Sequence, residues 1–86
     1  DLILYGQLIN GNKVIAEAKV EKDTAGKQLR DVLEECLLQL CRDLDISVPI
    51  WLKKNTKEFA MYRKTSFYSE QFVESIKFDR FDIKME

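Results

Sequence analysis

The chain has 86 residues, of which 45% are hydrophobic and 34% charged, and its formal net charge is −1 at pH 7. This length and composition predict one globular domain, residues 1–86, and exclude a disordered or fibrous chain. The near-zero net charge excludes a global field that would attract nucleic acid or an anionic membrane. No apolar run approaches the roughly 20 residues that span a bilayer and no signal segment opens the sequence, so we expect a cytoplasmic protein without membrane contact.

Two strands, at about 2–9 and 13–21, are the first elements expected, because β-rich runs flank Asn10-Gly11-Asn12. Asn and Gly are the usual residues of hairpin turns, and Asn12 is the expected left-handed residue. A two-residue Asn10-Gly11 turn would set Leu8 against Lys13. A three-residue loop would pair Leu8 with Val14 and make one face wholly apolar or small, so we predict the three-residue loop.

A long amphipathic helix is expected over about 25–46, with Asp23 or Thr24 as its N-cap. Its apolar residues recur every three or four positions and therefore share one face: Leu29, Val32, Leu33, Cys36, Leu37, Leu40, Cys41 and Leu44. Cys36 and Cys41 would point about 140° apart on this helix, so they cannot bridge. Buried free thiols in a reducing compartment are the expectation.

The second half of the chain predicts shorter elements. Pro49 ends any helical continuation, and Ile50 to Leu52 could form a short edge strand. Two short helices are expected at about 56–64 and 70–76, capped by Asn55 and Ser69, and a C-terminal strand at about 79–85. The fold class is therefore α+β. A right-handed crossover through the long helix would bring the last strand beside the first, which is a β-grasp-like order of elements, as in the ubiquitin-like class.

The second half also carries the following series of residues: Pro49-Ile50-Trp51-Leu52, Lys57-Glu58-Phe59, Lys64-Thr65-Ser66-Phe67, Phe72 and Phe78-Asp79. With its opening hairpin, the chain resembles a group of small uncharacterised bacterial proteins of similar length. The resemblance covers most of the chain and implies a bacterial intracellular protein of unassigned function. It brings no catalytic or binding residues.

Catalytic constellations are missing from the sequence. Without histidine, a serine or cysteine nucleophile lacks its usual base, and two cysteines are too few ligands for a metal site. Gly6, Gly11 and Gly26 stand too far apart for a phosphate-cradling loop. The acidic residues of the helix are interpreted as its solvated polar face. We therefore predict no enzyme activity, no catalytic residue, no cofactor and no metal.

A basic and aromatic segment, 51–68, is the strongest functional signal. We predict that its candidate surface residues are Trp51, Lys53, Lys54, Lys57, Tyr62, Arg63, Lys64 and Tyr68. The simpler interpretation is that the aromatic residues anchor the core and the lysines lie on the solvent-exposed surface. The function we predict is a non-enzymatic protein-interaction module or a small homo-oligomer, with an unknown protein or a second copy as partner. A partly exposed Trp51 would be its anchor.

Two alternatives stay open, a second function for this segment and a second surface. Basic and aromatic residues together are the composition that binds phosphate backbones and stacks bases, so weak nucleic-acid or phosphate-ligand binding through 51–68 is the alternative function. On the outer face of the hairpin, an apolar strip of Ile3, Tyr5, Ile9 and Ile15 would indicate self-association if the short helices leave it uncovered.

Overall fold

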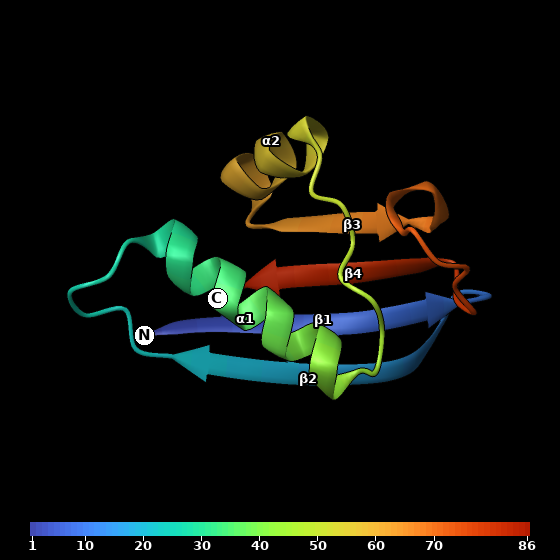
Figure 1. Ribbon diagram of the computed structural model, residues 1–86, viewed down its shortest axis with the longest axis horizontal. Coiled ribbons are helices and arrows are strands. Elements are labelled where there is room, and N and C mark those ends of the chain that lie inside the picture. Colours follow the sequence, from blue (N-terminus) through green and yellow to red (C-terminus); the bar gives the residue numbers. More distant parts are fainter.

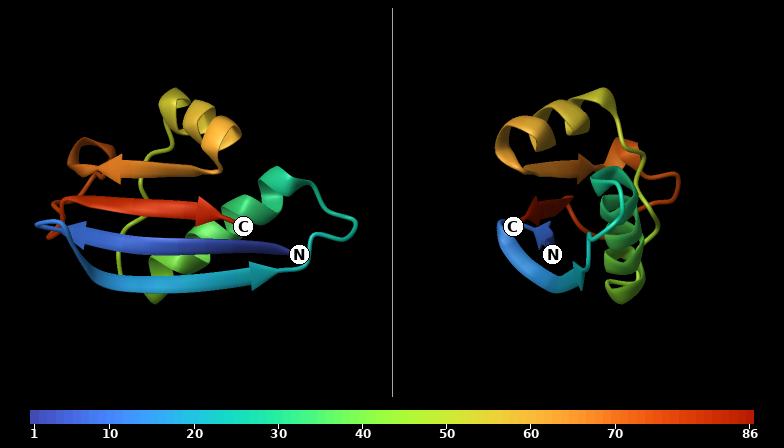
Figure 2. Two further views of the ribbon diagram at one scale, coloured as in Figure 1. Left: turned by 180° about the vertical axis from the view of Figure 1, so that it is seen from behind. Right: turned by 90° about the vertical axis from the view of Figure 1, so that its left-hand side faces the viewer.

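The computed structural model describes residues 1–86. Its elements are, in chain order, β1 (Leu2–Asn10), β2 (Lys13–Lys22), α1 (Leu29–Asp43), α2 (Lys53–Tyr62), β3 (Lys64–Tyr68), a 3-10 turn (Ser69–Gln71) and β4 (Arg80–Met85). The strands form one antiparallel sheet in the order β2-β1-β4-β3. Helix α1 covers one face of this sheet, whereas α2 lies beyond the β3 edge and extends toward the opposite face (Figures 1 and 2). The predicted α+β class is confirmed.

The hairpin has the expected strands but a different turn. Gly11 and Asn12 both have positive φ, +57° and +64°, which makes a two-residue turn of the primed type that suits the twist of a hairpin. The predicted left-handed Asn12 is confirmed, and the three-residue loop is wrong. Ile15 is left unpaired in a β-bulge, so Leu8 lies opposite Ala16. The bulge absorbs one residue and keeps the small, apolar residues of both strands on one face.

The core lies between that face and α1. Leu4, Leu40, Phe67 and Phe81 are among its fully buried side chains. Gly6 of β1 lies where α1 comes closest, because a Cβ there would sit 3.0 Å from Phe81 Cε1 and 3.1 Å from Leu40 Cδ1. The absence of a side chain at Gly6 therefore allows the helix to come close to β1 at this point.

Helix α1 buries most of the predicted apolar face but is shorter than predicted at both ends, and Leu29 in its first turn is 53% exposed. Val32, Cys36, Leu37, Leu40 and Cys41 are buried. The expected N-cap is wrong: the Asp23 carboxylate accepts a 3.0 Å bond from the Ala25 amide within a turn, Gly26 has φ +71°, and the N-cap is Gln28. At the other end Asp45 is left-handed, and the Ile46 amide donates to the Cys41 carbonyl at 2.9 Å.

The second half departs further from the predictions. Residues 50–52 form no strand, and α2 begins at Lys53 because Asn55 is the third helical residue, whose Oδ1 accepts from the Leu52 amide at 2.9 Å. The first short helix therefore begins earlier than predicted and ends at Tyr62, and 64–68 is a strand.

The predicted helix at 70–76 is wrong. Only the 3-10 turn forms there, because the Gln71 carboxamide accepts from the Tyr68 amide at 3.2 Å and Phe72 is already extended. Phe72 then packs edge-on against Phe78, which folds the intervening residues into a loop.

The sheet topology differs from the expected crossover. The last strand does pair beside the first, as predicted, but β1 and β4 are antiparallel. Because a right-handed crossover joins parallel strands, the β-grasp-like topology is not confirmed. Neither helix combines the length and the apolar character needed to cross a bilayer.

Candidate interaction surfaces

The predicted surface residues of the 51–68 segment do not form one surface. Trp51 and Arg63 line a groove on the side of α1, whereas Lys54, Tyr62, Lys64 and Tyr68 line a concavity on the other side of the sheet. Lys53 and Lys57 are exposed and line neither. The segment therefore contributes to two sites of different chemistry.

The apolar groove, as we call the first site, lies between α1 and α2. It has a volume of about 880 Å³ and is lined mainly by hydrophobic side chains. Its lining residues are Leu29, Arg30, Leu33, Glu34, Leu37 and Leu38 of α1, Val48, Pro49 and Trp51 of the connecting loop, Thr56, Phe59 and Ala60 of α2, and Arg63 and Met85. Leu29 is 53% exposed and Val48 47% exposed, so large apolar side chains in this groove are in contact with water.

Trp51 is both an anchor and part of the groove wall. Its ring lies 5.7 Å from the Phe59 ring and 5.6 Å from the Phe67 ring, and its Nε1 donates to Thr56 Oγ1 at 2.7 Å. The side chain is half-buried, so one part of it joins the core while another lines the groove. Core anchoring and surface exposure, which the sequence left as alternatives, are thus combined in one side chain. Tyr62 and Tyr68 do not join it.

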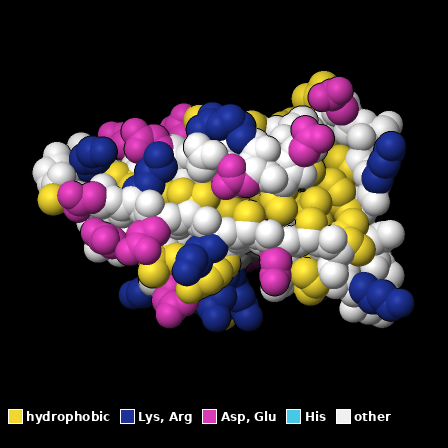
Figure 3. Space-filling model, turned by 90° about the horizontal axis from the view of Figure 1, so that it is seen from below, with side chains coloured by type: hydrophobic (Ala, Val, Ile, Leu, Met, Phe, Trp, Pro, Cys, Tyr) yellow, Lys and Arg dark blue, Asp and Glu magenta, His cyan; other side chains and the backbone are white.

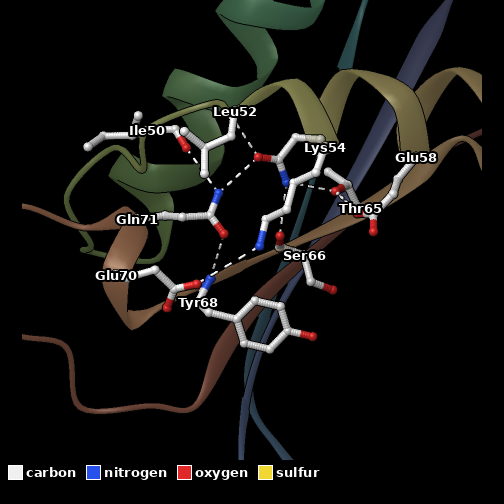
Figure 4. A network of polar contacts seen from close by, with 10 residues as sticks. Ile50, Leu52, Lys54, Glu58, Thr65, Ser66, Tyr68, Glu70 and Gln71 are labelled. Carbon is white, nitrogen blue, oxygen red and sulfur yellow. Dashed lines mark hydrogen bonds and ion pairs between the residues drawn. The ribbon is translucent and has the colours of Figure 1, made fainter.

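A buried polar network holds α2 and the connecting loop in place (Figure 4). Asn55 is its centre: Oδ1 accepts from the Leu52 amide and from Gln71 Nε2, while Nδ2 donates to Thr65 Oγ1 and the Ser66 carbonyl. Gln71 Nε2 also donates to the Ile50 carbonyl at 3.1 Å, and Thr65 Oγ1 donates to Glu58 at 2.6 Å. No buried side-chain nitrogen or oxygen lacks a partner. The loop that carries Trp51 is therefore rigidly joined to α2 and β3.

The charges around the apolar groove are mainly positive. Arg30 and Arg63 lie in its lining against the single acidic residue Glu34. The two ion pairs in the molecule, Lys54 with Glu70 and Arg80 with Asp82, involve neither arginine. The groove therefore presents apolar surface next to two guanidinium groups that form no ion pair and one carboxylate, a local excess of positive charge.

The polar concavity, our name for the second site, lies between α2 and the sheet face opposite α1. It has a volume of about 790 Å³, and its lining is mostly polar: Tyr5, Gln7, Lys54, Glu58, Tyr62, Lys64, Thr65, Ser66, Tyr68, Arg80, Asp82, Ile83, Lys84 and Glu86. Lys54 Nζ lies 5.4 Å from the centre of the Tyr68 ring, a cation–π contact. Arg80 is held by Asp82, which also accepts a 2.6 Å bond from Ser66 Oγ.

Three lysines and one tyrosine form a row across this sheet face. Strand pairing sets Lys64 opposite Lys84, Lys84 opposite Tyr5, and Tyr5 opposite Lys19. Directly opposed like charges destabilise a sheet, and none of these lysines has an ion-pair partner. Tyr5 is the aromatic member of the row, and a hydrogen bond to the Glu86 carboxylate, with burial and nearby acidic charge, raises its pKa. We call these four residues the lysine row.

The outer face of the hairpin is not the apolar strip that was considered. Ile9 is buried and Ile3 and Tyr5 are half-buried, while Ile15 alone is exposed. Lysines and carboxylates alternate with these residues on the same face.

The two cysteines are buried and free, as predicted. Burial raises the pKa of the Cys36 thiol, and it raises that of Cys41 from its ordinary value of 9.0 to about 11. Neither thiol is ionised at neutral pH, so neither is an activated nucleophile.

The stability of the fold should fall as pH rises from about 9 to 11. In this window the unfolded chain has lost the Cys41 proton while the native state still binds it, so the unfolding free energy decreases, by up to about 2.5 kcal/mol. Urea unfolding of the wild type and of Cys41→Ala at several pH values measures this contribution. Parallel pH profiles for the two proteins would contradict it.

Several surface residues were missed by reasoning from the sequence. Leu29 and Leu33 were assigned only to the core-facing side of α1, although they also line the apolar groove. Lys84 and Tyr5 were not grouped with Lys64 because the grouping depends on strand β3, which was not predicted. The alternation of buried Thr65 and Phe67 with Lys64, Ser66 and Tyr68 was the available signal for that strand.

Comparison of the chain with family models, curated proteins and solved structures gives no match. The resemblance to small bacterial proteins stays a prediction.

Proposed function

We propose that this chain is a non-enzymatic protein-interaction module whose apolar groove binds an apolar segment of a partner protein flanked by acidic residues. The observation that carries the proposal is the half-buried Trp51, fixed by Thr56, Phe59 and Phe67 in the wall of a mainly hydrophobic groove that also exposes Leu29 and Val48. Rigid aromatic side chains in apolar grooves are the usual anchors of protein interfaces.

The shape and charge of the groove favour an amphipathic segment. Two helices and a loop form its walls, as in complexes where an amphipathic helix lies in a hydrophobic groove. Arg30 and Arg63 have no ion-pair partner in the chain, so carboxylates beside the apolar residues of the ligand would compensate them. A basic amphipathic segment would be disfavoured by the same two charges.

Titration with a defined peptide tests this function. Trp51 is the single tryptophan of the chain, so its fluorescence reports on the groove directly. A helical amphipathic peptide with acidic flanks should bind saturably and shift the Trp51 emission, and the same apolar sequence with basic flanks should bind more weakly. No emission change with either peptide up to about 1 mM would contradict the proposal.

Leu29→Glu should weaken binding of the acidic-flanked peptide at least about tenfold. The change removes apolar contact area and adds a carboxylate that repels the ligand, and a loss of 1.4 kcal/mol corresponds to one factor of ten. Met61→Glu is the matched control, because Met61 is 66% exposed on α2 and lies outside the groove lining. Equal loss of affinity in both variants would place the peptide elsewhere.

The lysine row supports a second candidate function, weak binding of single-stranded nucleic acid on the open sheet face. Lys19, Lys64 and Lys84 could neutralise phosphates, and Tyr5 lies among them as a stacking surface. Glu58, Asp82 and Glu86 in the same concavity oppose this binding, so the protein-interaction function is the better supported of the two.

Salt dependence tests this second candidate. Three lysine contacts with a single strand predict a slope of about −2 in log binding constant against log salt concentration, and Lys84→Glu should make the slope shallower by about 0.7. Lys57→Glu carries the same charge change outside the concavity and serves as the control. An oligonucleotide that does not bind at low salt, or binds equally to both variants, would exclude the lysine row.

A further inference from the structure

Strand β2 is a ten-residue edge strand, and its outer side has no partner within the chain. The direction of its backbone groups follows from β1. Ile3 exchanges both backbone bonds with Glu86, so the odd residues of β1 point their amides and carbonyls toward β4 and the even residues point theirs toward β2.

The same alternation fixes which β2 groups point outward. Leu4, Gly6 and Leu8 pair with Val20, Ala18 and Ala16, whose backbone groups therefore face β1. The amides and carbonyls of Glu17, Lys19 and Glu21 then point away from the sheet. None of the backbone hydrogen bonds outside the helices and strands involves these three residues. The edge thus offers three consecutive donor and acceptor pairs to another strand.

We propose that two copies of this chain pair through β2, antiparallel about a two-fold axis at Ala18, to form a continuous eight-stranded sheet. In this register Glu17 of each copy lies opposite Lys19 of the other, and both residues have outward backbone groups. Glu17 and Lys19 would therefore be joined both by backbone hydrogen bonds and by the attraction of opposite charges. The two-fold axis makes this Glu17–Lys19 pair occur twice in the interface.

Charge selects this register over its neighbours. An axis at Lys19 would set Lys19 against its own copy and Glu17 against Glu21, and an axis at Glu17 would oppose two glutamates. Directly opposed like charges destabilise a strand pair. Of the three registers compared, only the one with its axis at Ala18 sets opposite charges against each other.

On the face of the sheet that α1 covers, the side chains along the β2 edge are small enough for two copies to come close together. Ala18 would meet its own copy there, and Ala16 would meet Val20, so the contacts are small and apolar. Ala16 and Ala18 are half-exposed in the single chain. Figure 3, which views the molecule from this edge, shows a band of hydrophobic side chains along it between charged groups.

The bulge at Ile15 limits the length of the new ladder. Pairing that is regular from Ala16 to Val20 ends where the bulge disturbs the strand, so the interface is short and the dimer should be weak and concentration-dependent. The β2 edge is at the opposite side of the sheet from β3 and α2. The proposal is therefore independent of the apolar groove, which a dimer would leave accessible in both copies.

Sedimentation equilibrium from about 1 μM to 1 mM tests this pairing. The wild type should be a monomer–dimer mixture. Lys19→Glu should raise the dissociation constant at least about tenfold, because both cross-strand pairs become repulsive. The double change Glu17→Lys with Lys19→Glu exchanges the charges, restores the complementarity and should restore dimerisation.

A backbone variant completes the test. In Lys19→Pro the missing amide is one that points outward, so the pairing with β1 is kept while the ladder between copies is interrupted. Circular dichroism should show a folded protein that stays monomeric. A wild type that is monomeric throughout, a dimer that Lys19→Glu leaves unchanged, or a folded Lys19→Pro protein that still dimerises would each overturn the proposal.

Discussion

Asn55→Asp should lower the free energy of unfolding by about 2 to 5 kcal/mol at neutral pH. The substitution keeps the volume of the side chain, so it creates no cavity, but it removes the Nδ2 donor that now bonds Thr65 Oγ1 at 2.8 Å and the Ser66 carbonyl at 3.0 Å. Two buried acceptors lose their donor and a carboxylate is buried in their place, each of which costs free energy.

The loss should be smaller in acid. A buried carboxylate without a cation has a folded-state pKa above the usual value near 4, so protonation favours the native state of the variant as pH falls. The protonated side chain also regains one donor. The stability difference between the wild type and Asn55→Asp should therefore narrow between about pH 6 and pH 4.

Urea unfolding followed by Trp51 fluorescence measures this difference. Lys57→Asp, at an exposed position of the same helix, is the matched control and should cost less than about 1 kcal/mol. Equal losses for the two variants, or a loss for Asn55→Asp that does not change with pH, would show that the buried network does not hold α2 in place.

Phe67→Ala should cost about 3 to 5 kcal/mol and should also loosen the apolar groove. Phe67 is fully buried, and its ring lies 5.6 Å from the Trp51 ring and 5.7 Å from that of Phe81. Truncation removes the support between the sheet and the groove wall and leaves a cavity. Trp51 should then become more exposed, and its emission should move to longer wavelength.

The control for this change is Tyr68→Ala on the neighbouring residue, whose side chain is 43% exposed on the other face. It should cost less than about 1 kcal/mol and leave the Trp51 emission unchanged. Phe67→Leu, with a smaller loss of volume, keeps the test usable if the alanine variant does not fold. An unfolding loss below about 1 kcal/mol for Phe67→Ala, or an unchanged Trp51 emission in a folded variant, would contradict this role.

Local patterns were sufficient to predict the hairpin and the buried face of α1. Spacing of three and four residues identified Cys36, Leu40 and Cys41 as core residues, and the structure buries them. The predicted hairpin loop was one residue too long. A two-residue turn followed by a bulge at Ile15 places Ala16, Ala18 and Val20 on the same face as a three-residue loop would, so the side-chain pattern does not distinguish the two.

The surface was less predictable because it depends on pairing between distant segments. Asn55 was interpreted as an N-cap, while its buried side chain in fact bonds Gln71 and Thr65, which no local pattern connects to it. Because strand β3 was not predicted, the alternation of side chains between the two faces of a strand, which places Phe67 and Tyr68 on opposite sides, was not used. Trp51 and Tyr68 were therefore grouped on one surface, although they lie on opposite sides of the sheet.

Chemical-shift mapping by two-dimensional ¹⁵N NMR tests the apolar groove most directly. When the acidic-flanked amphipathic peptide is added to the ¹⁵N-labelled chain, the largest shifts should occur at Leu29, Leu33 and the Trp51 indole N–H. The signals of Lys19 and Lys84, on the other face, should not move. Largest shifts at these two lysines, or no shifts at a saturating peptide concentration, would contradict the assignment of the groove as the binding site.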